Sequence, residues 1–303
     1  MSHSHSHSHA HSHDHKTSSL KVLLIVIAVI FVYALVEAAT GWYAGSLALL
    51  SDSGHMLSDA FALMIAAFAA WVAKKPPSQT HSFGMGRAEV VAALFSSVLL
   101  LVIAAAVIVE AVERLHAPIH VKAIPVMIIA FFGMLVNIVV AVILAKSERT
   151  LNMRAAMLHV LSDLLGSFAA LVAGAVIYVT GWSPIDPILS ILIGVLIAIS
   201  SLRILKEAMR ILLEGVPVHL SMTMIATEMK KVSGVLNVHD LHIWTLSSGT
   251  VSLSAHIDIH EISAWQQVLS DLSSMLDKKF EIDHITLQPE PEIFDCKPCQ
   301  TIM

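Results

Sequence analysis

A five-residue pattern that begins with histidine and ends with aspartate occurs twice in this chain, as His55-Met-Leu-Ser-Asp59 and as His159-Val-Leu-Ser-Asp163. Each copy lies inside a long apolar stretch, and a charged side chain at the centre of a bilayer costs about 2.5–3.5 kcal/mol. Residues i and i+4 share one face of an α-helix, so each copy points one imidazole and one carboxylate the same way. Two such helices facing each other would offer two nitrogen and two oxygen ligands, a tetrahedral set suited to Zn²⁺. The spacing therefore predicts an intramembrane site for a transported divalent metal, with zinc favoured.

The ligand types also indicate how such a site would work. Nitrogen ligands disfavour Mg²⁺ and Ca²⁺, which prefer cages of oxygen. Histidine titrates near neutral pH, so bound metal should expel protons and protons should expel metal, as in a metal/proton exchanger. The alternative is that the four groups only join helices by hydrogen bonds, but two identical sets weigh against it. Asp52 shares a face with His55 and suits either the route into the site or a polar contact between helices.

Two other classes of protein bury histidines and carboxylates in a membrane. An intramembrane metallohydrolase keeps an open metal position and a general base, as in an HExxH motif. The sequence has no HExxH motif, and four protein ligands fill the predicted site, so we do not expect an enzyme. A metal sensor would not need a mid-membrane site built from two helix repeats. No GxxxxGK[ST] nucleotide-binding motif is present either, so a proton gradient is the expected source of free energy.

Composition indicates a membrane protein. Of the 303 residues, 56% are hydrophobic and 14% are charged, and the mean hydropathy is +0.77. These values are too apolar for an ordinary soluble domain. The net charge of −5 is spread thinly and gives no indication of a nucleic-acid partner. Histidines stand where a signal peptide would have basic residues, so no cleaved signal peptide is expected.

Six apolar stretches approach the roughly 20 residues that cross a bilayer. Their expected bounds are about 20–42, 47–73, 88–112, 123–145, 155–180 and 186–206. Cationic side chains gather on one side of these spans, at Lys16, Lys21, Lys74, Lys75, Arg87, Lys146, Arg149, Arg154, Arg203, Lys206 and Arg210. The opposite side has only Arg114 and Lys122 near its loops, so both termini are expected in the cytoplasm. The two pentapeptides fall in the second and fifth spans, which are matching positions of two three-helix halves, where transporters place their substrate.

The chain is interpreted as four segments: a disordered histidine-rich tail at 1–19, a transmembrane domain at 20–206, a cytoplasmic domain at 207–291 and a C-terminal tail at 292–303. The cytoplasmic domain should contain a helix at 218–233, strands at 235–246 and 250–259, a helix at 262–279 and a last strand at 282–288. This order predicts a small α+β domain with antiparallel strands, ferredoxin-like in layout. The overall fold class is therefore an α-helical membrane protein with six transmembrane helices and a C-terminal cytoplasmic α+β ferredoxin-like domain.

The first segment has histidine at every second position from 3 to 15, mostly alternating with serine. Such a polar stretch cannot bury a core and is expected to be disordered. An expression tag is one explanation, but tags are usually contiguous histidines. The spaced pattern is better interpreted as a tail that captures metal.

Together these residues resemble the cation diffusion facilitator family, which comprises proton-coupled exporters of zinc and related metals. The resemblance covers almost the whole chain and lies in the stretch from Gly45 to His55 and Asp59, the loop His81-Ser-Phe-Gly-Met-Gly-Arg-Ala-Glu89, His159 with Asp163, Pro184-Ile-Asp-Pro187, and His239-Asp-Leu-His-Ile-Trp244. It implies a homodimer with six helices per subunit, alternating access, export from the cytoplasm, and cytoplasmic domains that pair with each other. In this family a site of two histidines and two aspartates goes with a preference for zinc over cadmium. Cd²⁺, Co²⁺ and Ni²⁺ are further candidate substrates, and a bacterial inner membrane is the expected location.

The resemblance also implies a metal site in the cytoplasmic domain. His239 and His256 match metal-binding positions of the family. His284 and Glu290 are candidates to complete that set, which would hold Zn²⁺ as a resident ligand.

Two further features carry over from the family in part. Some members bind a second metal in the loop after the second span, but here Ser78 and Met85 replace two of its ligands, so His81 is kept only as a residue of the access path. Cys296-Lys-Pro-Cys299 resembles the C-terminal CxxC of vertebrate zinc exporters, where the pair shares a zinc with an N-terminal histidine-containing segment. A CxxC outside a thioredoxin-like unit favours metal over redox chemistry. The histidine-rich tail could complete such a site with Cys296 and Cys299.

Overall fold

The computed structural model describes residues 13–44, 47–116, 123–147, 150–247, 249–282 and 284–291. Side chains are described from Leu20 onward within these ranges, except at 37, 40–55, 58, 123, 125 and 126. The chain divides into two compact units, Met1–Lys206 and Glu207–Met303.

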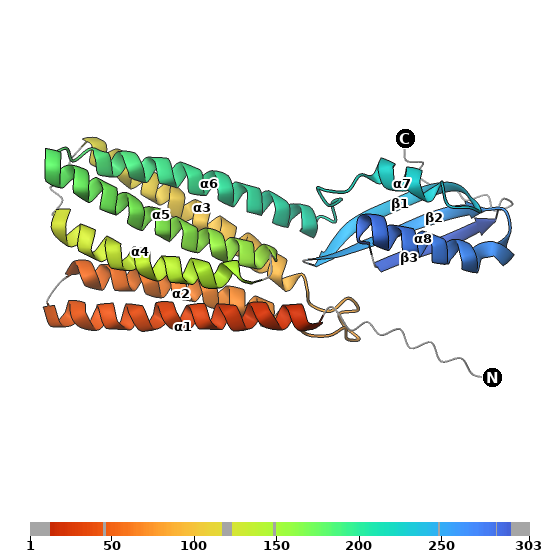
Figure 1. Cartoon of the computed structure of the whole chain (residues 1–303), viewed down its shortest axis with the longest axis horizontal. Coiled ribbons are helices and arrows are strands. Elements are labelled where there is room, and N and C mark those ends of the chain that lie inside the picture. The colour runs from red at the N-terminus through yellow and green to blue at the C-terminus, as the bar shows by residue number, and fades with distance from the viewer. Residues whose placement is uncertain are drawn as a thin grey trace. The chain divides into compact units, whose positions relative to one another are not determined.

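The first unit is a bundle of long helices that run side by side (Figure 1). Their bounds are His13–Ala44 (α1), Leu47–Ala73 (α2), Ala88–His116 (α3), Ala123–Ala145 (α4), Leu151–Thr180 (α5) and Ile185–Leu212 (α6). Within the described residues, four of them are long and apolar enough to cross a membrane, over Ala88–His116, Met127–Ala145, Leu151–Thr180 and Ile185–Leu212. The described parts of α1 and α2 contain shorter apolar stretches, Leu20–Val36 and Asp59–Ala73. The count of six spans therefore stays a prediction.

Local signals set the ends of α5. The Thr150 side chain accepts a hydrogen bond from the Met153 backbone N–H at 3.2 Å, which caps the N-terminus of the helix. Gly181 ends it with φ of +74° and donates its N–H to the Ile177 carbonyl at 2.8 Å. Glycine adopts this left-handed conformation without steric cost. The connection to the next helix is short, because α6 begins at Ile185.

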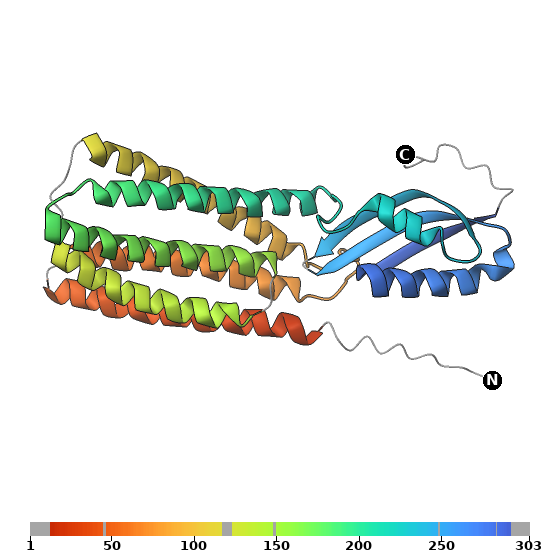
Figure 2. The same cartoon turned by 45° about the horizontal axis from the view of Figure 1, so that its top comes forward.

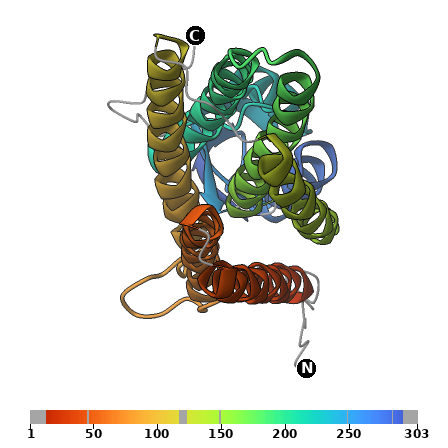
Figure 3. The same cartoon turned by 90° about the vertical axis from the view of Figure 1, so that its left-hand side faces the viewer.

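The helices pack in pairs, with α1 against α2 and α4 against α5, while α3 contacts both α2 and α5 (Figures 1 and 2). Figure 3 views the same bundle from one end. Small and branched apolar side chains fill the space between α1, α2, α4 and α5, among them Leu23, Val26, Leu63, Ala66, Val140 and Val160. Large apolar side chains remain exposed on the outside, including Phe61 and Phe68 at 63% each and Val179 at 80%. An apolar outer surface of this kind suits lipid rather than water.

The second unit contains α7 (Met222–Met229), β1 (Val235–Ser247), β2 (Thr250–Ile259), the 3-10 turn η1 (Ile262–Ala264), α8 (Trp265–Phe280) and β3 (His284–Pro291). Its sheet has the order β1-β2-β3. β1 pairs antiparallel with β2, but β3 pairs parallel with β2, so the expectation of antiparallel strands throughout is wrong. The chain crosses over through η1 and α8 before β3, and such a crossover returns the next strand in the same direction. The ferredoxin-like layout stays a prediction.

The core of this unit lies between the sheet and its helices. On α8 the buried residues Val268, Leu272, Leu276 and Phe280 recur at every fourth position, which places them on one face of the helix. That face meets Ile225 and Met229 of α7 and the buried side chains of β1 and β2. This packing holds β1, β2 and β3 in one rigid sheet, and the rigid sheet fixes the positions of the histidine and carboxylate side chains that it carries.

Candidate metal sites

The two pentapeptides lie on α2 and α5, and these helices contact each other. Asp59 on α2 is 7% exposed and His159 on α5 is 8% exposed. His159 Nε2 lies 3.0 Å from Asp59 Oδ1 and 3.9 Å from Asp163 Oδ2. One ligand atom from each of the three residues falls within 4.8 Å of the others. A single divalent ion can lie between atoms so placed, because zinc takes nitrogen and oxygen ligands at about 2.0–2.2 Å.

The fourth expected ligand, His55, also lies on α2. The backbone of α2 carries His55 one turn before Asp59, on the same helix face. The side chains of His55 and Asp52 lie outside the described residues. Their roles as ligand and as access-path carboxylate therefore stay predictions.

A cavity of about 480 Å³ lies beside the three described side chains. Its lining includes Asp59, His159 and Asp163, and it also includes Asp186 and Ser190 in the first turns of α6. Most of the remaining lining is aliphatic, from α3, α4, α5 and α6. The three candidate ligands therefore face a space large enough for an ion and several waters.

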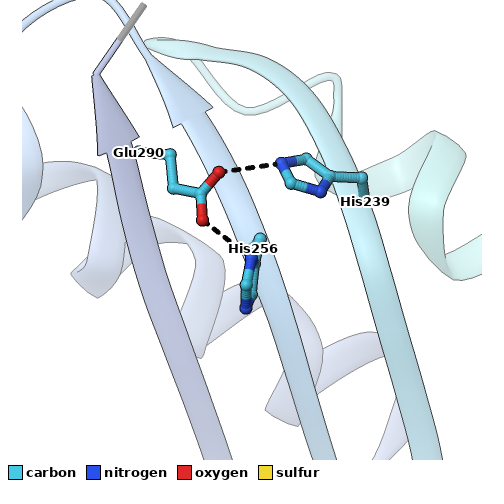
Figure 4. A group of neighbouring side chains, drawn as sticks. All are labelled: His239, His256 and Glu290. Atoms are coloured by element: carbon cyan, nitrogen blue, oxygen red, sulfur yellow. Dashed lines mark ion pairs between the residues drawn. The ribbon is translucent and has the colours of Figure 1, made fainter. Parts of the chain in front are cut away.

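A second group of ligand atoms lies on the sheet of the other unit. His239 is on β1, His256 is on β2 directly opposite it, and Glu290 is on β3 (Figure 4). Glu290 is 3% exposed, and its carboxylate reaches both imidazoles, with Oε2 at 3.2 Å from His239 Nε2 and Oε1 at 2.7 Å from His256 Nδ1. The three ligand atoms lie within 4.8 Å of one another. Two nitrogens and a carboxylate oxygen form a set that suits Zn²⁺.

Two aspartates of this cluster were not singled out from the sequence. Asp258 Oδ1 lies 3.2 Å from His239 Nε2, and Asp240 Oδ2 lies 3.7 Å from His256 Nε2. Asp258 follows His256 by two residues and so shares its face of the strand, a signal that was available in the sequence. Asp240 was harder to find, because it sits at an irregularity of β1 with φ of +49°. Only the bulged backbone brings its side chain to His256.

Among the described residues, two further candidates, His284 and His81, belong to neither group. His284 begins β3, six residues before Glu290, which is about 20 Å along an extended strand. His81 is exposed in the loop after α2, where its ring lies 3.1 Å from Thr80 Oγ1 and its backbone N–H bonds to Ser78. Cys296 and Cys299 lie outside the described residues. The binding roles of these four residues stay predictions.

Comparison with known proteins gives two family matches. Residues 23–213 match the model described as "Cation efflux transmembrane domain", and residues 217–292 match "Cation efflux protein, cytoplasmic domain". "Zinc transporter ZitB" of Escherichia coli is 39% identical over 261 residues, which are 85% of this chain and 83% of the relative. "Cadmium, cobalt and zinc/H(+)-K(+) antiporter" of Bacillus subtilis is 37% identical over 266 residues, 86% of this chain and 85% of the relative. "Metal cation efflux system protein CzcD" of Cupriavidus metallidurans is 35% identical over 270 residues, 88% and 84% of the two chains.

Proposed function

This chain belongs to the cation efflux (cation diffusion facilitator) family, and from that membership we propose that it exports Zn²⁺ from the cytoplasm in exchange for protons. It is an integral membrane transporter and not an enzyme. Relatives are named as transporters of zinc, or of cadmium, cobalt and zinc, and one is named as an antiporter using H⁺ and K⁺. Cd²⁺ and Co²⁺ are therefore secondary candidate substrates, and Ni²⁺ remains a weaker one.

One observation carries the proposal: Asp59, His159 and Asp163 converge across the contact of α2 and α5 although 100 residues separate the first two. Burial of three titratable groups inside a bundle with an apolar outer surface is unfavourable unless a bound charge compensates them. Zn²⁺ that sheds its water needs such replacement ligands. We assign His55 as the fourth ligand, because it lies on the same face of α2 as Asp59.

The pair His159 and Asp59 supports proton coupling. His159 Nε2 lies 3.0 Å from Asp59 Oδ1, and a hydrogen bond there in the metal-free protein would place a proton between the two atoms. A metal ligated by Nε2 must take the place of that proton, so binding releases a proton and protonation releases metal. The bundle alternates between the two sides of the membrane, and protons entering from the far side displace the ion. The proton gradient supplies the free energy.

The second unit would hold a resident ion on His239, His256 and Glu290. Glu290 contributes a nearly buried negative charge between two imidazoles, and Asp258 adds another carboxylate beside His239. Bound Zn²⁺ would supply the positive charge that this cluster of carboxylates favours. We further propose that this unit lies in the cytoplasm and mediates a homodimer, that both termini are cytoplasmic, and that the protein resides in a bacterial inner membrane. The histidine-rich tail would deliver metal from that side.

The proposal is tested with purified protein in liposomes under an imposed pH gradient, with zinc and internal pH recorded together. Asp163→Ala should reduce zinc flux to the level of protein-free vesicles, because it removes one ligand and one compensating charge. Glu113→Gln is the matched control, because it removes a carboxylate from the exposed end of α3 away from the cavity. Zinc moving against protons in the unaltered and control proteins is the expected result. Undiminished zinc flux in Asp163→Ala would refute the site, and zinc binding without any flux in the unaltered protein would favour a metal sensor.

A further inference from the structure

The bundle is unequal on the two sides of Asp59, His159 and Asp163. Toward the C-terminus of α5, the cavity of about 480 Å³ continues past Gly166 and Ser167. Toward the N-terminus of α5, a cavity of only about 10 Å³ adjoins His159. That volume holds about one water molecule. Among the described residues, the site therefore adjoins a large cavity on one side and only this small one on the other, which we call the open side and the closed side.

Four alanines lie where α2 meets α5 on the closed side. Ala62 and Ala66 of α2 and Ala155 and Ala156 of α5 line the small cavity, and the rest of its lining is His159 with Leu63, Ser96, Leu99 and Leu100. Ala66, Ala155 and Ala156 are at most 5% exposed. Small residues allow two helix backbones to approach closely, and the cavity that remains at this contact is only about 10 Å³. The closed region includes the C-terminal half of α2 and the N-terminal end of α5, which the proposed topology places at the cytoplasm.

One polar side chain is enclosed in this region. Asn152, in the first turn of α5, is 1% exposed, and its Nδ2 donates a hydrogen bond to the Ala66 carbonyl at 2.8 Å. The bond joins α5 directly to the backbone of α2. Asn152 precedes His159 by seven residues, about two helical turns, so the two side chains lie on one face of α5. An ion that moves toward His159 along the contact of α2 and α5 therefore meets Asn152 first.

The two polar atoms of this amide act in opposite directions on the closed arrangement. The bond from Nδ2 stabilises it, because both partners are shielded from water. The amide oxygen Oδ1 is buried, and no hydrogen-bond partner reaches it from the described residues. A buried acceptor without a partner disfavours the arrangement that buries it. If α2 and α5 separate, Nδ2 loses its bond while Oδ1 becomes accessible to water or an ion, so the gain at Oδ1 offsets part of the loss at Nδ2.

We propose that Asn152 is the positioning residue of a gate on the cytoplasmic side of the transport site. Its Nδ2 holds α2 against α5 when the gate is closed. Its Oδ1 is the first oxygen offered to a divalent cation when the gate is open. The identity of the ion and the cytoplasmic side rest on the proposed function, whereas the latch between the helices rests on the contact of Asn152 with Ala66.

The latch is tested by cysteine accessibility in detergent-solubilised full-length protein, without zinc or a pH gradient. Cys296 and Cys299 are the two native cysteines, and both are first replaced by serine. Ala155→Cys then reports the closed side, and Ala170→Cys, which lines the large cavity, reports the open side. The rate of modification by a polar maleimide is measured at each reporter with Asn, Asp or Leu at position 152.

When its carboxylate is ionised, Asn152→Asp keeps the size and the acceptor but lacks the donor, so it should raise the rate at Ala155→Cys about three- to tenfold, the effect of one hydrogen bond of ordinary net strength. Asn152→Leu removes the donor together with the unpaired oxygen, so its rate should not exceed that of the Asn152 protein. The rate at Ala170→Cys should not rise in either variant. The expected pattern is therefore faster modification at one reporter in one variant only.

Equal rates with Asp and with Asn, or faster modification with Leu, would overturn the latch. A rise at both reporters would also overturn it, because that pattern indicates a loosened bundle rather than an opened gate. Ala62→Cys on the facing helix repeats the measurement if Ala155→Cys itself disturbs the packing. The accessibility assay contains no zinc, so it tests the latch independently of transport. If the expected accessibility pattern is found but the unaltered protein moves no zinc in liposomes, the antiporter is refuted and the latch stands.

Discussion

Replacing Glu290 by glutamine should separate metal binding from folding in the second unit. The Glu290 carboxylate is 3% exposed and lies between His239 Nε2 at 3.2 Å and His256 Nδ1 at 2.7 Å. Glutamine has nearly the same shape, so it leaves no cavity in the sheet. It removes the negative charge and leaves an amide, which is a poor ligand for Zn²⁺. We therefore expect the variant to fold and to bind zinc weakly.

Zinc binding stabilises the folded unit by an amount that rises with its affinity. Loss of a residue that supports a metal site costs about 10–100-fold in affinity, and a direct ligand belongs at the upper end of that range or beyond. At a zinc concentration 100 times the Kd of the unaltered protein, binding stabilises the fold by about 2.7 kcal/mol. The same concentration stabilises a variant with 100-fold lower affinity by about 0.4 kcal/mol. For a domain of this size, 1 kcal/mol corresponds to about 4–8 °C in Tm.

The assay is thermal unfolding of the separately produced unit Glu207–Met303, in excess chelator and in zinc. Zinc should raise Tm by about 10–20 °C in the unaltered unit and by about 2–3 °C in Glu290→Gln. Glu261→Gln is the control, because Glu261 is an exposed carboxylate on the same unit outside the cluster. Its zinc response should equal that of the unaltered unit.

Two results would contradict a metal site at His239, His256 and Glu290. An unchanged zinc response in Glu290→Gln would show that the three residues do not hold the ion together. A fall of Tm by the same amount in chelator and in zinc would show that the carboxylate supports the sheet rather than a metal.

Two further predictions concern the stability of the second unit. Hydrogen bonds from Lys231 Nζ at 2.6 Å and Lys279 Nζ at 2.7 Å lower the pKa of Glu228 from 4.5 to about 2. A carboxyl group whose pKa is lower in the folded than in the unfolded protein stabilises the fold at pH values above its unfolded pKa. The unaltered protein should therefore be more stable than Glu228→Gln near neutral pH, and this difference should fade as pH drops from about 4.5 to about 2. The measurement is urea unfolding of chelator-treated protein. A constant difference across that pH window would exclude the pairing. Gly234 has φ of +91°, and an added Cβ would lie 2.8 Å from Val268 Cγ2. Gly234→Ala should therefore destabilise the unit by about 1–3 kcal/mol, as measured by urea unfolding. An unchanged urea midpoint would contradict that geometry.

Sequence periodicity located most elements of the second unit but not the direction of the last strand. The strand expected at 250–259 is β2, Thr250–Ile259, and the helix expected at 262–279 became η1 and α8. Alternation within a strand reports which face is buried and carries no information about its partner. The parallel pairing of β3 with β2 depends on where α8 packs, and it is this pairing that sets Glu290 opposite Asp258, within reach of His239 and His256.

The candidate ligands in the membrane unit were likewise only partly predictable from the sequence. The four-residue spacing of His159 and Asp163 is enough to place both on one helix face. Whether that face meets α2 could not be derived, because helix contacts depend on side chains far apart in the sequence. The structure brings His159 to Asp59 and leaves the role of His55 as a prediction. Asn152 gave no signal at all, since a single asparagine at a helix start is commonly a surface residue.

Features that depend on neighbouring residues could be predicted from the sequence. These are the apolar runs long enough to cross a bilayer, the sharing of a face by residues i and i+4, and most strands and helices of the second unit. Three other features became known only from the folded chain: which helix faces meet, the 3.0 Å approach of Asp59 and His159, and the hydrogen bond by which Asn152 joins α5 to α2. The two groups of features differ in the sequence separation of the interacting residues. Hydrogen bonding and side-chain periodicity act within a turn or a strand, whereas close packing couples residues 86 or 100 positions apart, and only the folded chain fixes which of them touch.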